Sequence, residues 1–219
     1  MKYELFQAGL RADSFKIRYD YYLRLVNEME DHLSGKLEAF FEELKKEELT
    51  DWQEEILIDE VHFYGVTSIN SLRKSFVLGI FSLFESHVTD LIDSASSNVF
   101  SIKDLKGSLT DRIKIYLKKT YGEEVSDLFT AKYNWGKVDN YSQIRNCIAH
   151  QDGVINSLNG KQKSAVDNLT GIKLKENTSE IEIEKEFCQL MLYDLRVFIE
   201  GLFDVLKGIV LEKNKVKNG

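Results

Sequence analysis

The sequence predicts an all-α helical bundle with one long N-terminal helix and a small β-hairpin at about residues 171–184. Apolar residues recur at steps of three and four over most of the chain, which is typical of amphipathic helices. Proline is absent, so no residue removes a backbone donor inside a helix. Alternation with period two is confined to 172–175 and 181–184, on either side of a polar turn.

The bulk composition is that of one soluble globular domain. The 219 residues are 43% hydrophobic and 30% charged, enough for one sizeable core. We expect a single domain over residues 1–219, with an N-terminal helical extension at 12–62 and a core at 68–210.

The composition also indicates a compartment. The N-terminus lacks the apolar run of a signal peptide, and the longest apolar stretch, 76–84, is too short to span a bilayer. The two cysteines have neither metal nor disulfide spacing. We expect a cytoplasmic protein with no membrane association and no cofactor.

The N-terminal third reads as two helices. Asp13 or Ser14 can cap the first, whose apolar stripe continues to Leu44. Gly35 lies in this stripe but costs only about 1 kcal/mol relative to alanine, so the helix continues through it. Thr50 opens a fresh capping signal, which predicts a short helix to about Val61 followed by a loop over 65–70.

The next helix is predicted to be the centre of the bundle. It opens at Asn70 or Ser71 and is apolar over more than half of its circumference. Glu85 lies in this apolar surface, where an unpaired carboxylate is costly. It is therefore either a hydrogen-bonding anchor between helices or a supporting group of an active site.

The following segments are predicted from local signals. Residues 96–107 read as a connection, and Ser108 begins a basic amphipathic helix that includes 112–119. A short helix is expected at 123–133, and a further helix at 135–150.

After Gly153 the sequence becomes polar, and we expect 156–167 to be mobile. The hairpin follows, and a final helix carries an apolar stripe from Phe187 to Ile209. Residues 213–219 are expected to be a frayed basic tail.

Charge is unevenly distributed in this acidic chain of net charge −7. Residues 38–60 carry ten acidic side chains against two lysines, whereas 103–119 carry six basic against two acidic ones. A polyanion would therefore meet the second region, through Arg112, Lys114, Lys118 and Lys119. The plain alternative is that both runs are solvated helix faces.

The densest group of reactive side chains is Arg145, Asn146 and His150. On a helix, Tyr141, Ile144 and Ile148 would face the core. Asn146 and His150, four residues apart, would lie together on the opposite side, so that Asn146 can hydrogen-bond and orient the imidazole. All three polar groups, Arg145 included, would face away from the core towards solvent or a partner. Imidazole can exchange a proton at physiological pH, and a guanidinium can stabilise charge on phosphate oxygens. RNA supplies its own nucleophile, the 2′-hydroxyl, so this chemistry needs no metal.

One copy of this group is predicted to be half a site. Arg145 and His150 are separated by about 7.5 Å along the helix axis as well as by angle. Either the helix ends at Ala149, so that His150 can swing, or two copies meet across a two-fold axis. The plain alternative is an ordinary exposed helix end, where a histidine is favoured by the helix dipole.

Other chemistry has less support. The four histidines are scattered without metal-ligand spacing, so no metal site is expected. Cys147 lies on a different helix face from His150 and is expected to be a packed apolar residue. Glycine-rich phosphate loops are absent, which disfavours nucleotide binding.

The pattern Arg145-Asn146-x-x-x-His150, preceded by Ile144 and followed by Gly153, resembles the signature of the HEPN superfamily (higher eukaryotes and prokaryotes nucleotide-binding domains). The resemblance covers about residues 68–210. Residues 72–76 leading into 81–85 look like the central helix of a bacterial HEPN-like family linked to phage defence, and 113–117 with the late hairpin fit the same pattern.

The resemblance implies a helical homodimer that cuts RNA without a metal, as a toxin or abortive-infection effector. Arg145 and His150 would be the catalytic pair, with Asn146 as the polar residue beside the arginine. Glu85 would be the supporting carboxylate. A cognate antitoxin or regulatory protein is implied as a further partner. The competing hypothesis is a non-catalytic helical dimerisation or interaction module, which the acidic net charge favours.

Overall fold

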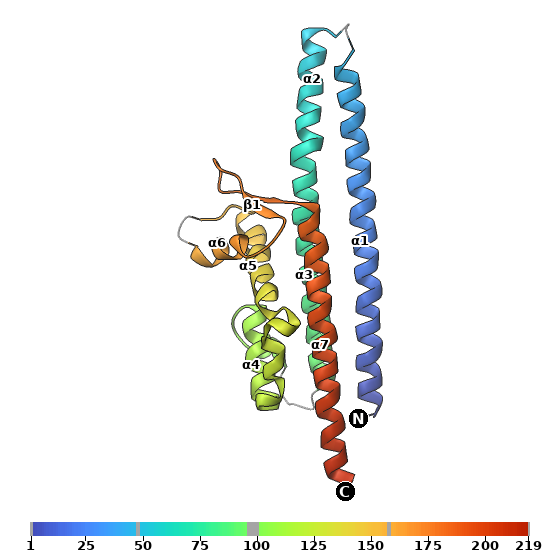
Figure 1. Ribbon diagram of the computed structural model, residues 1–219, viewed down its shortest axis with the longest axis vertical. Coiled ribbons are helices and arrows are strands. Elements are labelled where there is room, and N and C mark those ends of the chain that lie inside the picture. Colours follow the sequence, from blue (N-terminus) through green and yellow to red (C-terminus); the bar gives the residue numbers. More distant parts are fainter. Residues whose placement is uncertain (1, 47–48, 96–100, 157–158, 219) are drawn as a thin grey trace.

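A computed structural model describes residues 2–46, 49–95, 101–156 and 159–218. Three long segments run side by side along the long axis (Figure 1): α1 (Lys2–Leu44), the rod formed by α2 (Asp51–His62) with α3 (Ile69–Ala95), and α7 (Lys185–Asn218). The shorter elements lie together on one side of them. They are α4 (Leu109–Tyr121), α5 (Trp135–Gln151), α6 (Gly160–Asp167), β1 (Ile172–Leu174) and β2 (Ile181–Ile183). The expected all-α bundle with a late β-hairpin is confirmed.

Helix α1 is longer than expected. It begins at Lys2, so the expected cap at Asp13 or Ser14 is wrong. Gly35 lies inside the helix, as expected, with open space where a side chain would be. Tyr19 and Val26 are buried, so this half of α1 belongs to the core.

The expected loop at 65–70 is also wrong. The capping box of Thr50 and Gln53 opens α2 as expected, but the π-helical segment η1 (Phe63–Ser68) joins α2 to α3 without a break. At Gly65 an added Cβ would lie 3.3 Å from Leu37 of α1, so the small residue lets the two helices approach closely. A π-turn keeps backbone donors paired, and no residue forces the helix to end.

Asn70 does not cap a helix but links α3 to the hairpin. Its buried side chain donates to the carbonyl of Ile181 at 3.2 Å and accepts from the amide of Ile183 at 3.1 Å. Because both partners lie more than a hundred residues away, local sequence could not indicate this role.

Helix α3 occupies the centre, as expected. Ile80, Phe84 and Val88 are fully buried, and the Phe84 ring lies 5.9 Å from that of Phe198 on α7. By contrast, α2 has no buried residue and extends with the end of α1 beyond the other elements (Figure 1).

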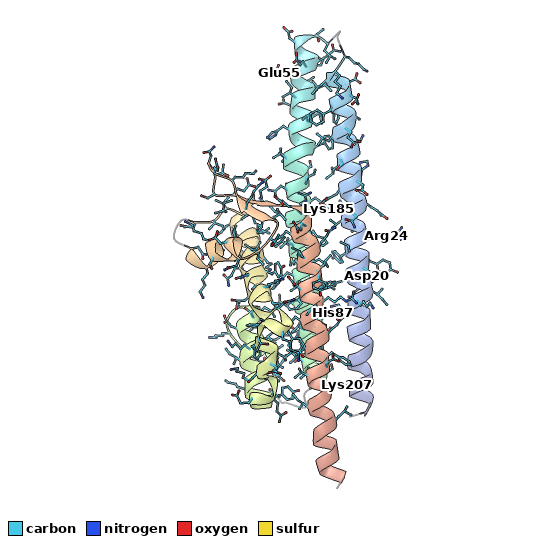
Figure 2. The ribbon with its side chains drawn as sticks, viewed as in Figure 1. Asp20, Arg24, Glu55, His87, Lys185 and Lys207 are labelled. Carbon is cyan, nitrogen blue, oxygen red and sulfur yellow. The ribbon has the colours of Figure 1, made fainter. Side chains whose placement is uncertain are left out.

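The charged side chains of α1 divide into two kinds. Asp20 and Arg24 are exposed on its outer side (Figure 2), whereas Glu30 is buried and accepts from Arg73 of α3 at 2.8 Å. Lys185, at the start of α7, lies 3.8 Å from the same carboxylate. Three long elements therefore meet around one buried charge.

The middle of the chain contains 3₁₀ segments as well as an α-helix. Ser108 caps α4 with Asp111, as expected. The single helix expected at 123–133 is wrong, because the 3₁₀ segments η3 (Gly122–Phe129) and η4 (Ala131–Tyr133) occupy this region. The expected connection at 96–107 contains the 3₁₀ turn η2 (Ile102–Asp104), and its residues 96–100 lie outside the described residues.

Two stretches that were expected to be mobile or frayed contain helix. Helix α6 forms inside the polar stretch 156–167 because Asn159 caps it and Gln162, Ala165 and Val166 are buried. Residues 157–158 of that stretch lie outside the described residues. Helix α7 continues to Asn218 through the expected frayed tail.

The hairpin is confirmed, with β1 and β2 antiparallel and Lys173 opposite Glu182. The sequence stretch judged too short for a membrane is part of a longer rod. Residues 51–95 contain a window of mean hydropathy 1.3 that could span a bilayer by length and composition, and 56% of that window is buried inside the protein. This single helix is weak grounds for membrane association, because buried core helices have the same composition.

Candidate functional site

Helix α5 carries the motif and packs as expected. Tyr141, Ile144 and Ile148 are buried against the core. Cys147 is buried on the same helix, and burial raises the pKa of its thiol to about 11. The interpretation of Cys147 as a packed residue is consistent with this environment.

A buried polar cluster fixes the first half of α5, and we call it the Asp194 cluster. The carboxylate of Asp194, on α7, is almost fully buried. It accepts from Asn134 Nδ2 at 2.9 Å, from Lys137 Nζ at 3.1 Å and from Tyr141 Oη at 2.8 Å. Burial, followed by the Asp194 charge, raises the pKa of Tyr141. Desolvated bonds to a carboxylate hold α5 in one rotational setting on α7.

Sequence reasoning missed this cluster. Asp194 lies in the apolar stripe of a helix just as Glu85 does, so the same reasoning about a carboxylate among apolar residues could have found it.

Lys74 fixes the end of α5. Its side chain comes from α3, and its ammonium donates to the carbonyl of Asp152 at 2.9 Å and to Glu180 Oε1 at 2.6 Å. Gly153 adopts φ +80°, and an added Cβ there would lie 2.9 Å from Lys74 Cε. Glycine is thus required both for the left-handed conformation and for the close approach.

The helix therefore does not end at Ala149. It continues through Gln151, and the Gly153 amide donates to the Cys147 carbonyl at 3.2 Å to close its last turn. The alternative in which His150 swings on a frayed end is wrong.

A pocket of about 220 Å³ lies between α3, α4 and α5, and we call it the α3–α4–α5 pocket. Its surface is mostly polar. The lining residues are Phe81, Glu85, Gly107, Ser108, Leu109, Arg112, Ser142, Arg145 and Asn146.

Glu85 is paired inside this pocket. Arg112 Nη2 of α4 donates to Glu85 Oε1 of α3 at 2.7 Å. Both interpretations of Glu85 fit this position. As an anchor it joins two helices, and as a supporting group it lies beside the motif. Arg112, expected to meet RNA on the surface, is mostly enclosed.

Arg145 and Asn146 lie on the pocket wall and are half-buried. The expectation that both face outward is therefore wrong for this part of the motif. Arg145 Nη1 donates to Asn146 Oδ1 at 3.0 Å. The Nε atoms of Arg145 and Arg112 are buried without a hydrogen-bond partner among the described residues. A buried unpaired donor costs about 1–3 kcal/mol, so an acceptor nearby would be favoured.

His150 lies outside the pocket, exposed on the last turn of α5. Within the described ranges its ring makes no hydrogen bond or ion pair, and the Asn146 oxygen is used by Arg145. The expected Asn146–His150 contact does not form. The structure thus brings Glu85, Arg112, Arg145 and Asn146 together and leaves His150 apart.

The remaining basic residues lie on the outer face of α4. Lys114, Lys118 and Lys119 are exposed, and Lys114 Nζ lies 5.9 Å from the Phe129 ring centroid. In the part of the chain that the structure describes, no group of three or more His, Cys, Asp or Glu side chains could hold a metal ion.

Comparisons with known proteins found no match: no family model, no curated protein and no solved structure matches this chain.

Proposed function

We propose that this protein is a metal-independent endoribonuclease that cuts RNA by 2′-hydroxyl transesterification, acting as a phage-defence or toxin–antitoxin effector. The observation that carries the proposal is the setting of the motif on α5. A rigidly held helix end presents the exposed His150, and the same helix contributes Arg145 and Asn146 to a polar pocket. The resemblance of this motif to the HEPN signature supports the same chemistry.

His150 would take the proton from the 2′-hydroxyl, whose oxygen then attacks the adjacent phosphorus. The bond from phosphorus to the 5′-oxygen breaks, and that oxygen receives, through a water molecule, the proton that His150 took. Arg145 stabilises the charge that builds up on the phosphoryl oxygens. The products are a 2′,3′-cyclic phosphate end and a 5′-hydroxyl end.

The arginine and the histidine of one site come from two copies of the chain. Within one chain the pocket wall with Arg145 does not include His150, so the two groups need a partner to converge on one phosphate. Helix α5 has no large exposed apolar side chain, so such a contact would be polar and sensitive to salt.

Cleavage of single-stranded RNA in EDTA tests the proposal. We expect cleavage with 2′,3′-cyclic phosphate ends, and its loss in His150→Ala and in Arg145→Ala. The matched controls His62→Ala and Arg24→Ala remove exposed residues of the same types away from α5 and should cut as the wild type does. Wild-type cleavage by both motif variants would contradict the proposal.

A second candidate function is a helical interaction module, which exposed apolar residues on α1 favour. Ile17, Tyr21, Leu25 and Met29 recur every fourth residue and are all exposed. Leu25 and Met29 also line an apolar groove of about 470 Å³ between α1 and α3. Such a stripe is a common feature of helix pairing.

Charge indicates a second copy as the occupant of this stripe. Residues 16–24 carry three basic and one acidic side chain, whereas 28–44 carry six acidic and one basic. Two α1 helices packed antiparallel about Leu25 would therefore place opposite charges together.

Sedimentation equilibrium of Leu25→Glu, with Leu211→Glu as an exposed control, tests this second function. It predicts that only Leu25→Glu becomes monomeric and inactive in cells, while His150→Ala behaves as the wild type. If His150→Ala loses the cellular effect, the interaction module alone is not the function.

A further inference from the structure

The charges lining the α3–α4–α5 pocket favour an anion. Arg112 and Arg145 are permanently charged, and Glu85 is the sole acidic residue on the wall. Asp111 is engaged with Ser108 at the start of α4, and Asp139 accepts from Thr110, so neither neighbouring carboxylate lines the pocket. The lining thus carries two positive charges and one negative charge.

The donors of the two arginines are only partly used. Arg112 gives one bond to Glu85, and Arg145 gives one to Asn146. Each guanidinium has five N–H groups, and in both the Nε–H is buried without an acceptor among the described residues. Two guanidinium forks on one small pocket match the oxygens of a phosphate group.

The size of the pocket sets the ligand class. Pockets for drug-sized molecules have volumes of about 300–1,000 Å³, so a pocket of about 220 Å³ suits one phosphate group better than a whole nucleotide. Arg112 is held against Glu85 on a neighbouring helix, which fixes its fork in place.

We propose that the α3–α4–α5 pocket binds a phosphate group of the RNA strand, with Arg112 and Arg145 as its ligands and Glu85 as the residue that positions Arg112. This inference rests on the proposed function. Since Arg145 and His150 of one chain are about 7.5 Å apart along the α5 axis, the phosphate in the pocket is the one that the His150 of a second copy reaches, and holding it sets the register of the strand.

Binding of a 2′-O-methyl RNA strand to the full chain tests this site. Such a strand lacks the nucleophile, so binding is measured whether or not the protein cuts RNA. We expect Arg112→Gln to weaken binding at least tenfold and to lower the salt slope by about 0.7. The control Lys207→Gln removes an exposed lysine of α7 and should change binding less than twofold.

Glu85→Gln separates a ligand site from a purely structural pair. The glutamine side-chain oxygen can still accept from Arg112 and keep it in position, while the one negative charge of the pocket is removed. Binding should therefore strengthen several-fold, whereas a structural pair would give weaker or unchanged binding. Inorganic phosphate should compete with the strand and raise the Tm of the wild type. Strand binding that excess inorganic phosphate leaves unchanged would contradict a site for a single phosphate group.

If Arg112→Gln fails to fold, Glu85→Gln and phosphate competition decide the matter. Unchanged or weaker strand binding by folded Glu85→Gln, or wild-type binding by folded Arg112→Gln, would overturn the inference. Should the strand bind as expected while no RNA is cut, the phosphate site stands and the nuclease proposal fails.

Discussion

The two ends of the motif on α5 lie in opposite environments. Arg145 and Asn146 are half-buried on the wall of a polar pocket, where the arginine is paired with the asparagine beside it. His150 is exposed on the last turn, yet the backbone beneath it is held by Lys74 and the hairpin. An exposed side chain on a fixed backbone is suited to meeting another molecule, whereas the enclosed arginine is suited to holding one group.

This difference predicts that the two ends respond differently to substitution. Substitutions at the exposed end should lower activity and leave the free energy of unfolding unchanged. Substitutions of the buried residues that hold α5 should lower both. The following predictions run from the largest expected effect to the smallest.

Removal of the His150 ring should separate activity from stability. We expect His150→Ala to lower cleavage by about 10²–10⁴-fold, since it removes the general base, while the free energy of unfolding changes by less than about 0.5 kcal/mol. Cleavage rates and urea unfolding curves of the same preparation measure both. If the urea unfolding curve of His150→Ala shows a clear loss of unfolding free energy together with the lost cleavage, His150 has a structural role.

Removal of the Asp194 carboxylate should destabilise the protein most. Asp194→Ala leaves the Tyr141 hydroxyl and the Asn134 amide unpaired in a buried setting, and we expect a loss of about 3 kcal/mol. Asp204→Ala, on an exposed position of the same helix, is the matched control and should stay within about 0.5 kcal/mol. Equal urea midpoints for the two variants would mean that the Asp194 cluster does not hold α5.

Acid should weaken the attachment of the hairpin to the end of α5. Hydrogen bonding by Lys74, aided by Lys175, lowers the pKa of Glu180 below its ordinary value near 4.5 despite some burial. The stabilisation is therefore present above the ordinary pKa and is lost as the pH falls through the lowered one.

Thermal unfolding between about pH 5 and about pH 3 measures this loss. We expect the Tm of the wild type to fall more than that of Glu180→Gln, which lacks the titrating group. Glu176→Gln, at an exposed position of the same turn, should follow the wild type. Parallel curves for the wild type and Glu180→Gln would argue against this ion pair.

Chemical labelling should distinguish the two faces of α5. The exposed His150 ring should react with an imidazole reagent in the native protein. The thiols of Cys147 and Cys188 should not react at pH 8, because burial raises their pKa to about 11 and about 12. Mass spectrometry of the labelled peptides measures the modification of His150 and of the two cysteines. Rapid native labelling of Cys147 would show that this face of α5 is open.

Features with local signals could be predicted from the sequence. The caps at Thr50 and Ser108 are correct because a capping box needs only four adjacent residues. The hairpin was predicted because its apolar residues alternate with polar ones, and the buried face of α5 because its apolar residues recur every three or four positions.

Features that depend on distant partners could not be predicted. Lys74 and Glu180 are 106 residues apart, and Asn70 bonds a strand that lies still further along the chain. At the π-helical junction of 63–68, Gly65 lies close to Leu37 of α1, a contact with a distant segment that local sequence does not indicate. The sequence predicted that His150 is exposed, but not that Arg145 and Asn146 are half-buried on the wall of a pocket.

The central claim is that Arg145 and His150 act together only when two copies of the chain meet. Mixing Arg145→Ala with His150→Ala tests it most directly, because a mixed dimer retains one intact arginine and one intact histidine on different chains. We predict that each variant alone is inactive in EDTA and that the mixture regains cleavage, up to about a quarter of the wild-type rate if each dimer has two equivalent sites. A mixture as inactive as its components would contradict the claim.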